Sequence, residues 1–128
     1  LDRSNKERQS IQSLLSEKVN FEAKKYHNHP VLVLAGNNWH EGIIGIVAAR
    51  LKDKFNKPVI IISIDSGVGK ASARSIVGFD IGSIIIAATQ ENILLKGGGH
   101  KMAGGFSIKV ENIQKFKASF FRLTLVTR

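Results

Sequence analysis

A run of three glycines followed by a histidine and a lysine is the densest group of anion-binding candidates in the chain. The run consists of Gly97, Gly98, Gly99, His100 and Lys101. Because glycine has no Cβ, such a run can adopt positive φ and turn several backbone N–H groups toward one phosphate. A helical turn beginning at His100 would add the positive end of its dipole. The run therefore predicts a phosphate cradle, and the alternative is a flexible loop ahead of a strand.

A second polar group follows a strand-like alternation. Lys70, Ser72 and Arg74 occupy every other position, with alanines between them. In a β-strand these side chains share one face, where Arg74 can grip a phosphate with two N–H groups and Ser72 can donate its hydroxyl. The alternative for Arg74 is a surface salt bridge. The segment 67–70 resembles the end of a P-loop, but it lacks the first glycine and the magnesium-binding hydroxyl, which excludes a nucleoside triphosphatase.

A third polar group contains Trp39, His40 and Glu41 and follows the apolar segment 31–35. Loops at the carboxyl ends of buried strands are where open α/β sheets place their ligand sites. Trp39 is either a stacking platform for a base or a rim or core aromatic, and an isolated histidine such as His40 is more often structural. The carboxylates are scattered and give no set of metal ligands, and no Ser/His/Asp nucleophile arrangement is indicated.

Hydrophobic periodicity predicts the elements that position these groups. The expected elements are helices over 2–25, 43–55, 81–88 and from 112 onward, and strands over 31–35, 58–64, 68–76 and 105–110. The first two strands and the helix between them indicate a parallel βαβ unit. The sequence therefore predicts an α/β fold with a small mixed sheet, parallel and antiparallel, flanked by helices. Residues 1–29 are expected to form a long linker helix with a joint, and residues 30–128 a single subdomain.

The chain of 128 residues is strongly basic, with 19 Lys and Arg against 10 Asp and Glu, and its isoelectric point is near 10.1. This excess favours a polyanionic partner such as nucleic acid; the alternative is a solvated basic face. The absence of cysteine fits a reducing compartment, which we expect to be the cytoplasm. No apolar run approaches the roughly 20 residues of a membrane span. Because the chain lacks an initiator Met, we expect it to be part of a longer protein.

Together these groups resemble the RecJ family of bacterial single-strand-specific exonucleases, which belongs to the DHH phosphoesterase superfamily. The matching segments are Leu1-Asp2-x-x-Asn5-x-x-Arg8-Gln9, Trp39-His40-x-Gly42-Ile43-Ile44, Ser72-Ala73-Arg74-Ser75 and Gly97-Gly98-Gly99-His100. The glycine element is shared with other DHH phosphoesterases, whereas the Trp-His-x-Gly and Ser-Ala-Arg-Ser elements point to RecJ. The resemblance is to the DHH-associated C-terminal subdomain and the helix ahead of it, and it covers nearly the whole chain.

This resemblance implies a division of labour between this chain and a catalytic domain outside it. The parent protein would be a hydrolase, a 5′ to 3′ exonuclease for single-stranded DNA, whose missing domain binds manganese or magnesium. Carried over by position, Ser72 and Arg74 would contact substrate phosphates near the scissile bond, and His100 with its glycines the same region. Asn5 and Arg8 would lie near the DNA path. The fragment itself would bind no cofactor, fold, and leave DNA uncut.

Two alternatives to this function stay open. The first is a subdomain of a DHH-superfamily oligoribonuclease or cyclic-dinucleotide phosphodiesterase, which the chain-length preference of the intact protein would distinguish. The second is a non-catalytic module that binds nucleic acid or tRNA, as in the related C-terminal domain of alanyl-tRNA synthetase. The motif over residues 1–9 argues against the second alternative.

Overall fold

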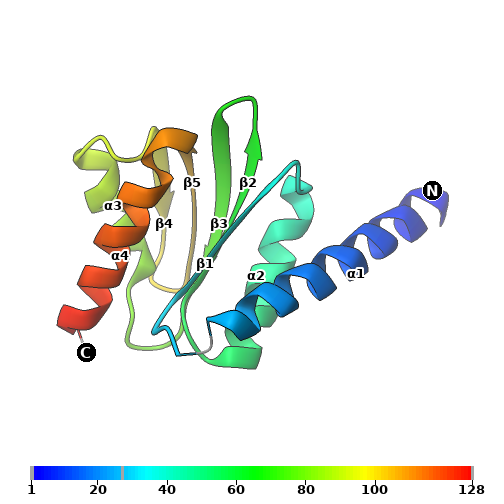
Figure 1. Ribbon diagram of the computed structural model, residues 1–128, viewed down its shortest axis with the longest axis horizontal. Coiled ribbons are helices and arrows are strands. Elements are labelled where there is room, and N and C mark those ends of the chain that lie inside the picture. The colour runs from blue at the N-terminus through cyan, green and yellow to red at the C-terminus, as the bar shows by residue number, and fades with distance from the viewer. Residues whose placement is uncertain (1, 27, 128) are drawn as a thin grey trace.

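The computed structural model describes the backbone of residues 2–26 and 28–127, and the side chains of these residues except 2–8, 11 and 122–127. A five-stranded sheet lies at the centre, with α1 and α2 on one face and α3 and α4 on the other (Figure 1). The elements in chain order are α1 (Asp2–Lys25), β1 (Leu32–Asn37), α2 (Glu41–Phe55), β2 (Val59–Asp65), β3 (Val68–Arg74), α3 (Ile81–Gln90), β4 (Lys96–Gly99), β5 (Ala103–Lys109), the 3-10 turn η1 (Val110–Asn112) and α4 (Ile113–Thr127). Within this described part, no helix is long and apolar enough to cross a lipid bilayer.

The sheet is mixed, and its strand order is β1-β2-β3-β5-β4. β1 and β2 are parallel and α2 connects them, whereas the other neighbouring strands pair in antiparallel fashion. A tight turn joins β2 to β3, and its central residues Ser66 and Gly67 have φ values of 54° and 81°. Two positive φ values suit a two-residue hairpin. This topology confirms the predicted α/β class and its mixed sheet.

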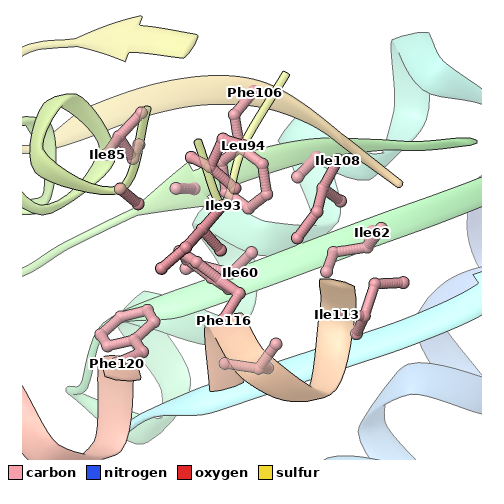
Figure 2. Close-up of a cluster of buried hydrophobic side chains, with 14 of the residues drawn as sticks. Ile60, Ile62, Ile85, Ile93, Leu94, Phe106, Ile108, Ile113, Phe116 and Phe120 are labelled. Carbon is pink, nitrogen blue, oxygen red and sulfur yellow. The ribbon is translucent and has the colours of Figure 1, made fainter. Parts of the chain in front are cut away.

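Two hydrophobic cores cover the two faces of the sheet because neighbouring side chains of β2 point in opposite directions. Ile60 belongs to the core formed with α3 and α4, and Ile61 to the core formed with α1 and α2; both are fully buried. Figure 2 shows the first core, in which the Phe116 ring lies 4.9 Å from that of Phe106 and 5.7 Å from that of Phe120. Burial on both faces explains why this strand is uninterruptedly apolar.

The first helix packs against the rest of the chain through Leu15, Val19 and Ala23, which are buried at four-residue spacing in the core shared with α2. Such a stripe is what an amphipathic surface helix requires. The bounds of α1 confirm the predicted helix over 2–25. The division of the chain at residues 29 and 30 remains a prediction.

The third strand is shorter than predicted and ends at Arg74 instead of residue 76. The next residue, Ser75, is buried and turns the chain toward α3. Its N–H donates to the Met102 carbonyl at 2.8 Å, and its hydroxyl donates to the Phe79 carbonyl at 2.7 Å. Because these bonds satisfy the N–H and hydroxyl groups of Ser75, the residue needs no further pairing with β2.

Candidate nucleic-acid interface

The glycine run forms one strand of a β-hairpin, and so it is not the flexible loop that was the alternative to a phosphate cradle. β4 pairs with β5 so that Gly98 stands opposite Gly105, and the turn between the strands spans 100–102. No helical turn begins at His100. Of the three glycines, Gly99 alone has a positive φ, at 157°. The backbone of the run is therefore extended along β5, and it does not curl around a single point.

Close packing explains why this hairpin contains glycine. A Cβ on Gly99 would lie 2.5 Å from the Ala103 carbonyl oxygen, and a Cβ on Gly97 would lie 2.7 Å from Cγ2 of Ile85 in α3. A Cβ on Gly98, in contrast, would meet nothing within 4 Å, because alternate residues of a strand face opposite sides of the sheet. Two of the glycines are thus required by packing, and the third leaves an open position.

The polar row predicted on β3 is confirmed. Ala71 and Ala73 are buried in the core with α3 and α4, whereas Lys70, Ser72 and Arg74 lie on the opposite face, which carries α2. Their partners on β5 are Ser107, Gly105 and Ala103, and β4 adds Lys96 and Gly98 beside the first two. On this face α1 and α2 cover β1 and β2. No described helix lies over β5 and β4 there, so this half of the face is open.

A groove of about 490 Å³ runs over the open half of the sheet, next to α2. Its lining includes Glu41, Ile44, Lys70, Ser72, Lys96 and Ser107. Beside Ser72, the next two strands carry Gly105, which lines the groove, and then Gly98. Main chain instead of side chain therefore forms the surface of the sheet at this level. The two lysines give the groove a positive charge, which favours an anionic ligand.

Arg74 and Ser72 lie against α2 at Gly45, where no side chain intervenes. A Cβ on Gly45 would lie 3.0 Å from Arg74 Nη2 and 3.4 Å from Ser72 Oγ. Arg74 Nη1 donates to the Ala73 carbonyl at 2.7 Å, which holds the guanidinium in place. The guanidinium has further N–H donors, and the Ser72 hydroxyl is one more. Together they can donate to the oxygens of a single phosphate.

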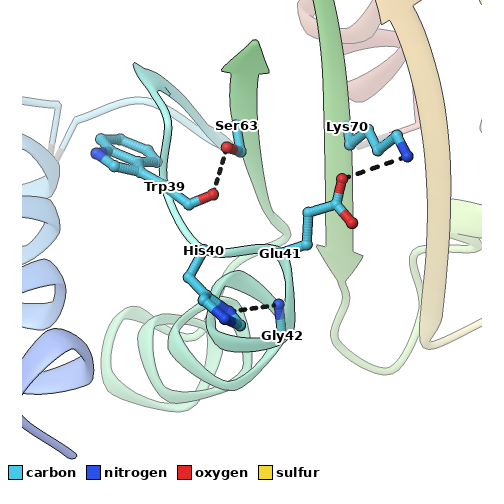
Figure 3. Close-up of polar contacts among 6 residues, drawn as sticks. All are labelled: Trp39, His40, Glu41, Gly42, Ser63 and Lys70. Atoms are coloured by element: carbon cyan, nitrogen blue, oxygen red, sulfur yellow. Dashed lines mark hydrogen bonds and ion pairs between the residues drawn. The ribbon is translucent and has the colours of Figure 1, made fainter. Parts of the chain in front are cut away.

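An ion pair crosses the groove at its end near the start of α2. Lys70 Nζ lies 3.4 Å from Glu41 Oε1, and the two side chains are 59% and 60% exposed (Figure 3). Exposed pairs of this kind contribute about 0–1 kcal/mol to stability. The pair is therefore easily opened, and Lys70 remains available to an anion in the groove.

Trp39 and His40 do not line the groove. A Cβ on Gly36 would overlap the indole ring of Trp39, which packs partly buried against the core shared by α1 and α2; Figure 3 shows the ring on the side away from Lys70. His40 Nδ1 accepts a hydrogen bond from the Gly42 N–H at 3.1 Å and caps α2. These contacts fit the structural alternatives for both residues, and their roles in binding substrate remain predictions.

His100 lies in the same cross-strand row as Arg74. Its N–H donates to the Ala103 carbonyl at 2.8 Å, and Ala103 stands opposite Arg74. The main chain of His100 is therefore one strand away from that of Arg74. Asn5 and Arg8 belong to the first turns of α1, but their side chains lie outside those that the structure describes.

Lys101 lies in the turn between β4 and β5, next to the start of α3. Its carbonyl accepts from the Ile81 N–H at 3.1 Å. Hydrogen bonds from the hydroxyl and then the N–H of Ser83 lower the pKa of Asp80, and the charge of Lys101 adds a smaller contribution in the same direction. Asp80 is the N-cap of α3, and the backbone hydrogen bond between Ile81 and Lys101 fastens the hairpin to this end of the helix.

The described side chains do not form a set of metal ligands. Within them, no three His, Cys, Asp or Glu side chains come close enough together to hold a metal ion. The residues of this groove therefore do not fit a metal centre, and the groove's own chemistry is hydrogen-bond donation and positive charge.

Several residues in or beside the groove were not predicted from the sequence. Ser107 and Gly105 alternate with buried Phe106 on β5, and this alternation was the available signal that they face the other side of the sheet. Gly45 lies within an apolar helical pattern, and nothing in that pattern indicates that it faces Arg74. Glu41 was recognised as polar but not as a rim residue.

Comparison with known proteins agrees with this geometry. The family model of the DHHA1 domain matches residues 28–124. The chain is 43% identical to the single-stranded-DNA-specific exonuclease RecJ of Haemophilus influenzae over 86 residues, and this alignment covers 65% of the chain. It is 35% identical to RecJ of Bacillus subtilis over 121 residues, and that alignment covers 92% of the chain. The chain spans 15% of the length of each of these two relatives.

Among solved structures, the fold is similar to that of RecJ in complex with Mn²⁺ from Thermus thermophilus. The TM-score is 0.84 at 28% identity, and the match covers 97% of this chain and 18% of that one. A family match over residues 28–124 is decisive, and the chain belongs to the DHHA1 domain family. Within that family, its resemblance is to the DHHA1 region of RecJ, as the sequence motifs had predicted.

Proposed function

We propose that this chain is the substrate-binding subdomain of a RecJ-like exonuclease and that its groove binds the phosphate backbone of single-stranded DNA. The observation that carries the proposal is the placement of Ser72, which lines the groove, and Arg74, two residues further along β3, together against Gly45 of α2. Hydroxyl and guanidinium donors placed together are well suited to a phosphodiester, because Arg presents its N–H groups in a fixed fork.

The charge of the groove supports the same ligand. Lys70 and Lys96 line it, and the chain as a whole carries a formal net charge of +9. A strand that binds here would release counterions, so log K should fall by about 0.7 for each phosphate neutralised per log unit of salt. His100, in the same row as Arg74, would add a donor to the same phosphate region.

Hydrolysis requires groups that the groove does not supply. The relatives named RecJ are single-stranded-DNA-specific exonucleases, and one was solved with Mn²⁺. In our proposal the divalent metal and the residues that hold it belong to another part of the full-length protein. The present chain positions the strand opposite that centre and does not cut it.

The test compares full-length proteins carrying Arg74→Ala and Arg74→Lys. We expect Arg74→Ala to weaken binding of single-stranded DNA by between about 10-fold and 100-fold, the range for a charge-assisted hydrogen bond. Arg74→Lys keeps the charge but loses the fork, so we expect an intermediate loss. Lys115→Ala removes a charge from exposed α4 on the other face of the sheet and serves as the control. Wild-type affinity in Arg74→Ala would refute the proposal.

A further inference from the structure

A second cavity opens beyond the ion pair that crosses the end of the groove. Its volume is about 410 Å³, and it shares Glu41 and Lys70 with the groove. The cavity lies where β1 and β2 end and β3 begins, and it is lined there by Asn38, Asp65 and Val68. A ligand held in the groove can therefore extend into this cavity past one weak, exposed ion pair.

The chemistry of this cavity differs from that of the groove. Glu41 and Asp65 contribute two carboxylates against the single ammonium of Lys70, so the lining is negative overall and repels phosphate. The Ser63 hydroxyl donates its hydrogen to the Trp39 carbonyl, which leaves it lone pairs to offer. Carboxylates only accept hydrogen bonds. Asn38 adds an amide that both donates and accepts, and Trp39 and Val68 complete the lining, so among the charged side chains two acceptors stand against the single donor Lys70.

The geometry points to this cavity as a nucleobase subsite that prefers bases with an exocyclic amino group. The inference rests on the proposed function, because the groove must first hold the neighbouring phosphate. A base is flat and uncharged, and a cavity of about 410 Å³ is large enough to admit one. Carboxylates accept from the N4 amino group of cytosine, whereas thymine offers a carbonyl at the same position. Asp65 is the residue that would make this distinction: its Oδ1 accepts from the Ser66 hydroxyl at 3.1 Å, and its second carboxylate oxygen can accept from the base.

The experiment measures binding of the full-length protein to oligothymidine strands that carry one cytosine at successive positions, in EDTA to prevent hydrolysis. We expect one position at which cytosine tightens binding about fivefold, at the low end of the discrimination of a single base contact. Asp65→Asn should abolish that preference. Glu91→Gln, a loss of the same charge at the exposed end of α3, should retain it.

A modified DNA base tests the same contact with wild-type protein, so that misfolding of a variant cannot explain the result. N4,N4-dimethylcytosine at the preferred position removes the donor hydrogens while the protein stays wild type, and it should bind no better than thymine. Equal binding of cytosine and thymine at every position, or a preference that survives in Asp65→Asn, would overturn the subsite. The proposed function has a separate test. Arg74→Ala should weaken the binding of all DNA strands equally, and it should leave the preference for cytosine unchanged.

Discussion

Arg74 extends its guanidinium over Gly45 of α2, so that Nη2 would lie 3.0 Å from a Cβ at that position. A separation of this size is tighter than ordinary van der Waals contact. The side chain that grips the proposed phosphate is therefore placed by the absence of a side chain on the neighbouring helix. Ser72, whose Oγ would lie 3.4 Å from the same Cβ, depends on that absence less strongly.

The first prediction concerns Gly45→Ala. The added methyl should displace the guanidinium of Arg74 and weaken binding of single-stranded DNA by about fivefold to tenfold, at the low end for a hydrogen bond to a charged group. The same change should raise helix stability by up to about 1 kcal/mol, because alanine replaces glycine inside a helix. Binding assays and thermal melts of the full-length protein would measure the two effects.

Ile46→Ala is the control for this prediction, because Ile46 is on the same helix but 45% exposed. It should leave DNA affinity unchanged. A Gly45→Ala protein that binds DNA as tightly as wild type would contradict the role given to the contact between Gly45 and Arg74.

The second prediction concerns Glu41→Gln. Removing this carboxylate frees Lys70, 3.4 Å away, and lowers the repulsion of phosphate at the groove rim. We expect oligothymidine to bind about threefold more tightly, within the range for an exposed ion pair, and affinity to fall more steeply with salt. Titrations at several salt concentrations would measure both effects. Weaker binding by this variant would indicate that Glu41 itself contacts the strand.

The third prediction compares neighbouring glycines of β4. Gly98→Ala should fold normally, because its Cβ would meet nothing within 4 Å, yet it should narrow the groove floor and weaken DNA binding. Gly99→Ala should lower the free energy of unfolding by about 1–3 kcal/mol, since a φ of 157° and a carbonyl 2.5 Å away leave no room for a methyl. Chemical denaturation and binding assays would separate the two. Equal losses of stability would argue against the described hairpin.

The fourth prediction follows from the lowered pKa of Asp80. Because Ser83 and, to a smaller extent, Lys101 stabilise its ionised form in the folded protein, the cap contributes stability above the ordinary value of 3.8 and loses it as the pH falls through the lower folded value. Wild type should therefore lose more thermal stability than Asp80→Asn between pH 7 and about pH 3. Parallel melting curves of the two proteins would contradict this.

The fold could be predicted from the sequence more completely than the site. The fold follows from local patterns, whereas the site depends on contacts between residues that are far apart in the sequence. Burial of Ile60 and Ile61 on opposite faces, the cap at Asp80 and the alternation around Ser72 are all set by local periodicity or spacing. Each was therefore accessible from the residues alone. The hairpin at Gly98 depends instead on pairing with β5, a contact that the local pattern does not contain.

Contacts between distant elements determine the features of the site that could not be predicted from the sequence. Trp39 follows a buried strand, and the packing of its ring over Gly36 could not be predicted from that position; its role in binding substrate stays a prediction. The closeness of Gly45 and Arg74 arises where α2 crosses β3, and no pattern in either segment specifies it. The resemblance to RecJ identified Ser72 and Arg74 together, but it gave no reason for their geometry.

The bare main chain at Gly98 and Gly105 has a thermodynamic consequence for any ligand of the groove. A floor without side chains has no rotamers to lose when a strand settles on it, so the ordering cost of binding falls on the flexible rim lysines Lys70 and Lys96. The hydrogen-bond ladder of the sheet fixes the shape of that floor before the ligand arrives. Evolution can therefore adjust how tightly this groove holds DNA by changing rim residues, while the surface on which the strand rests stays constant.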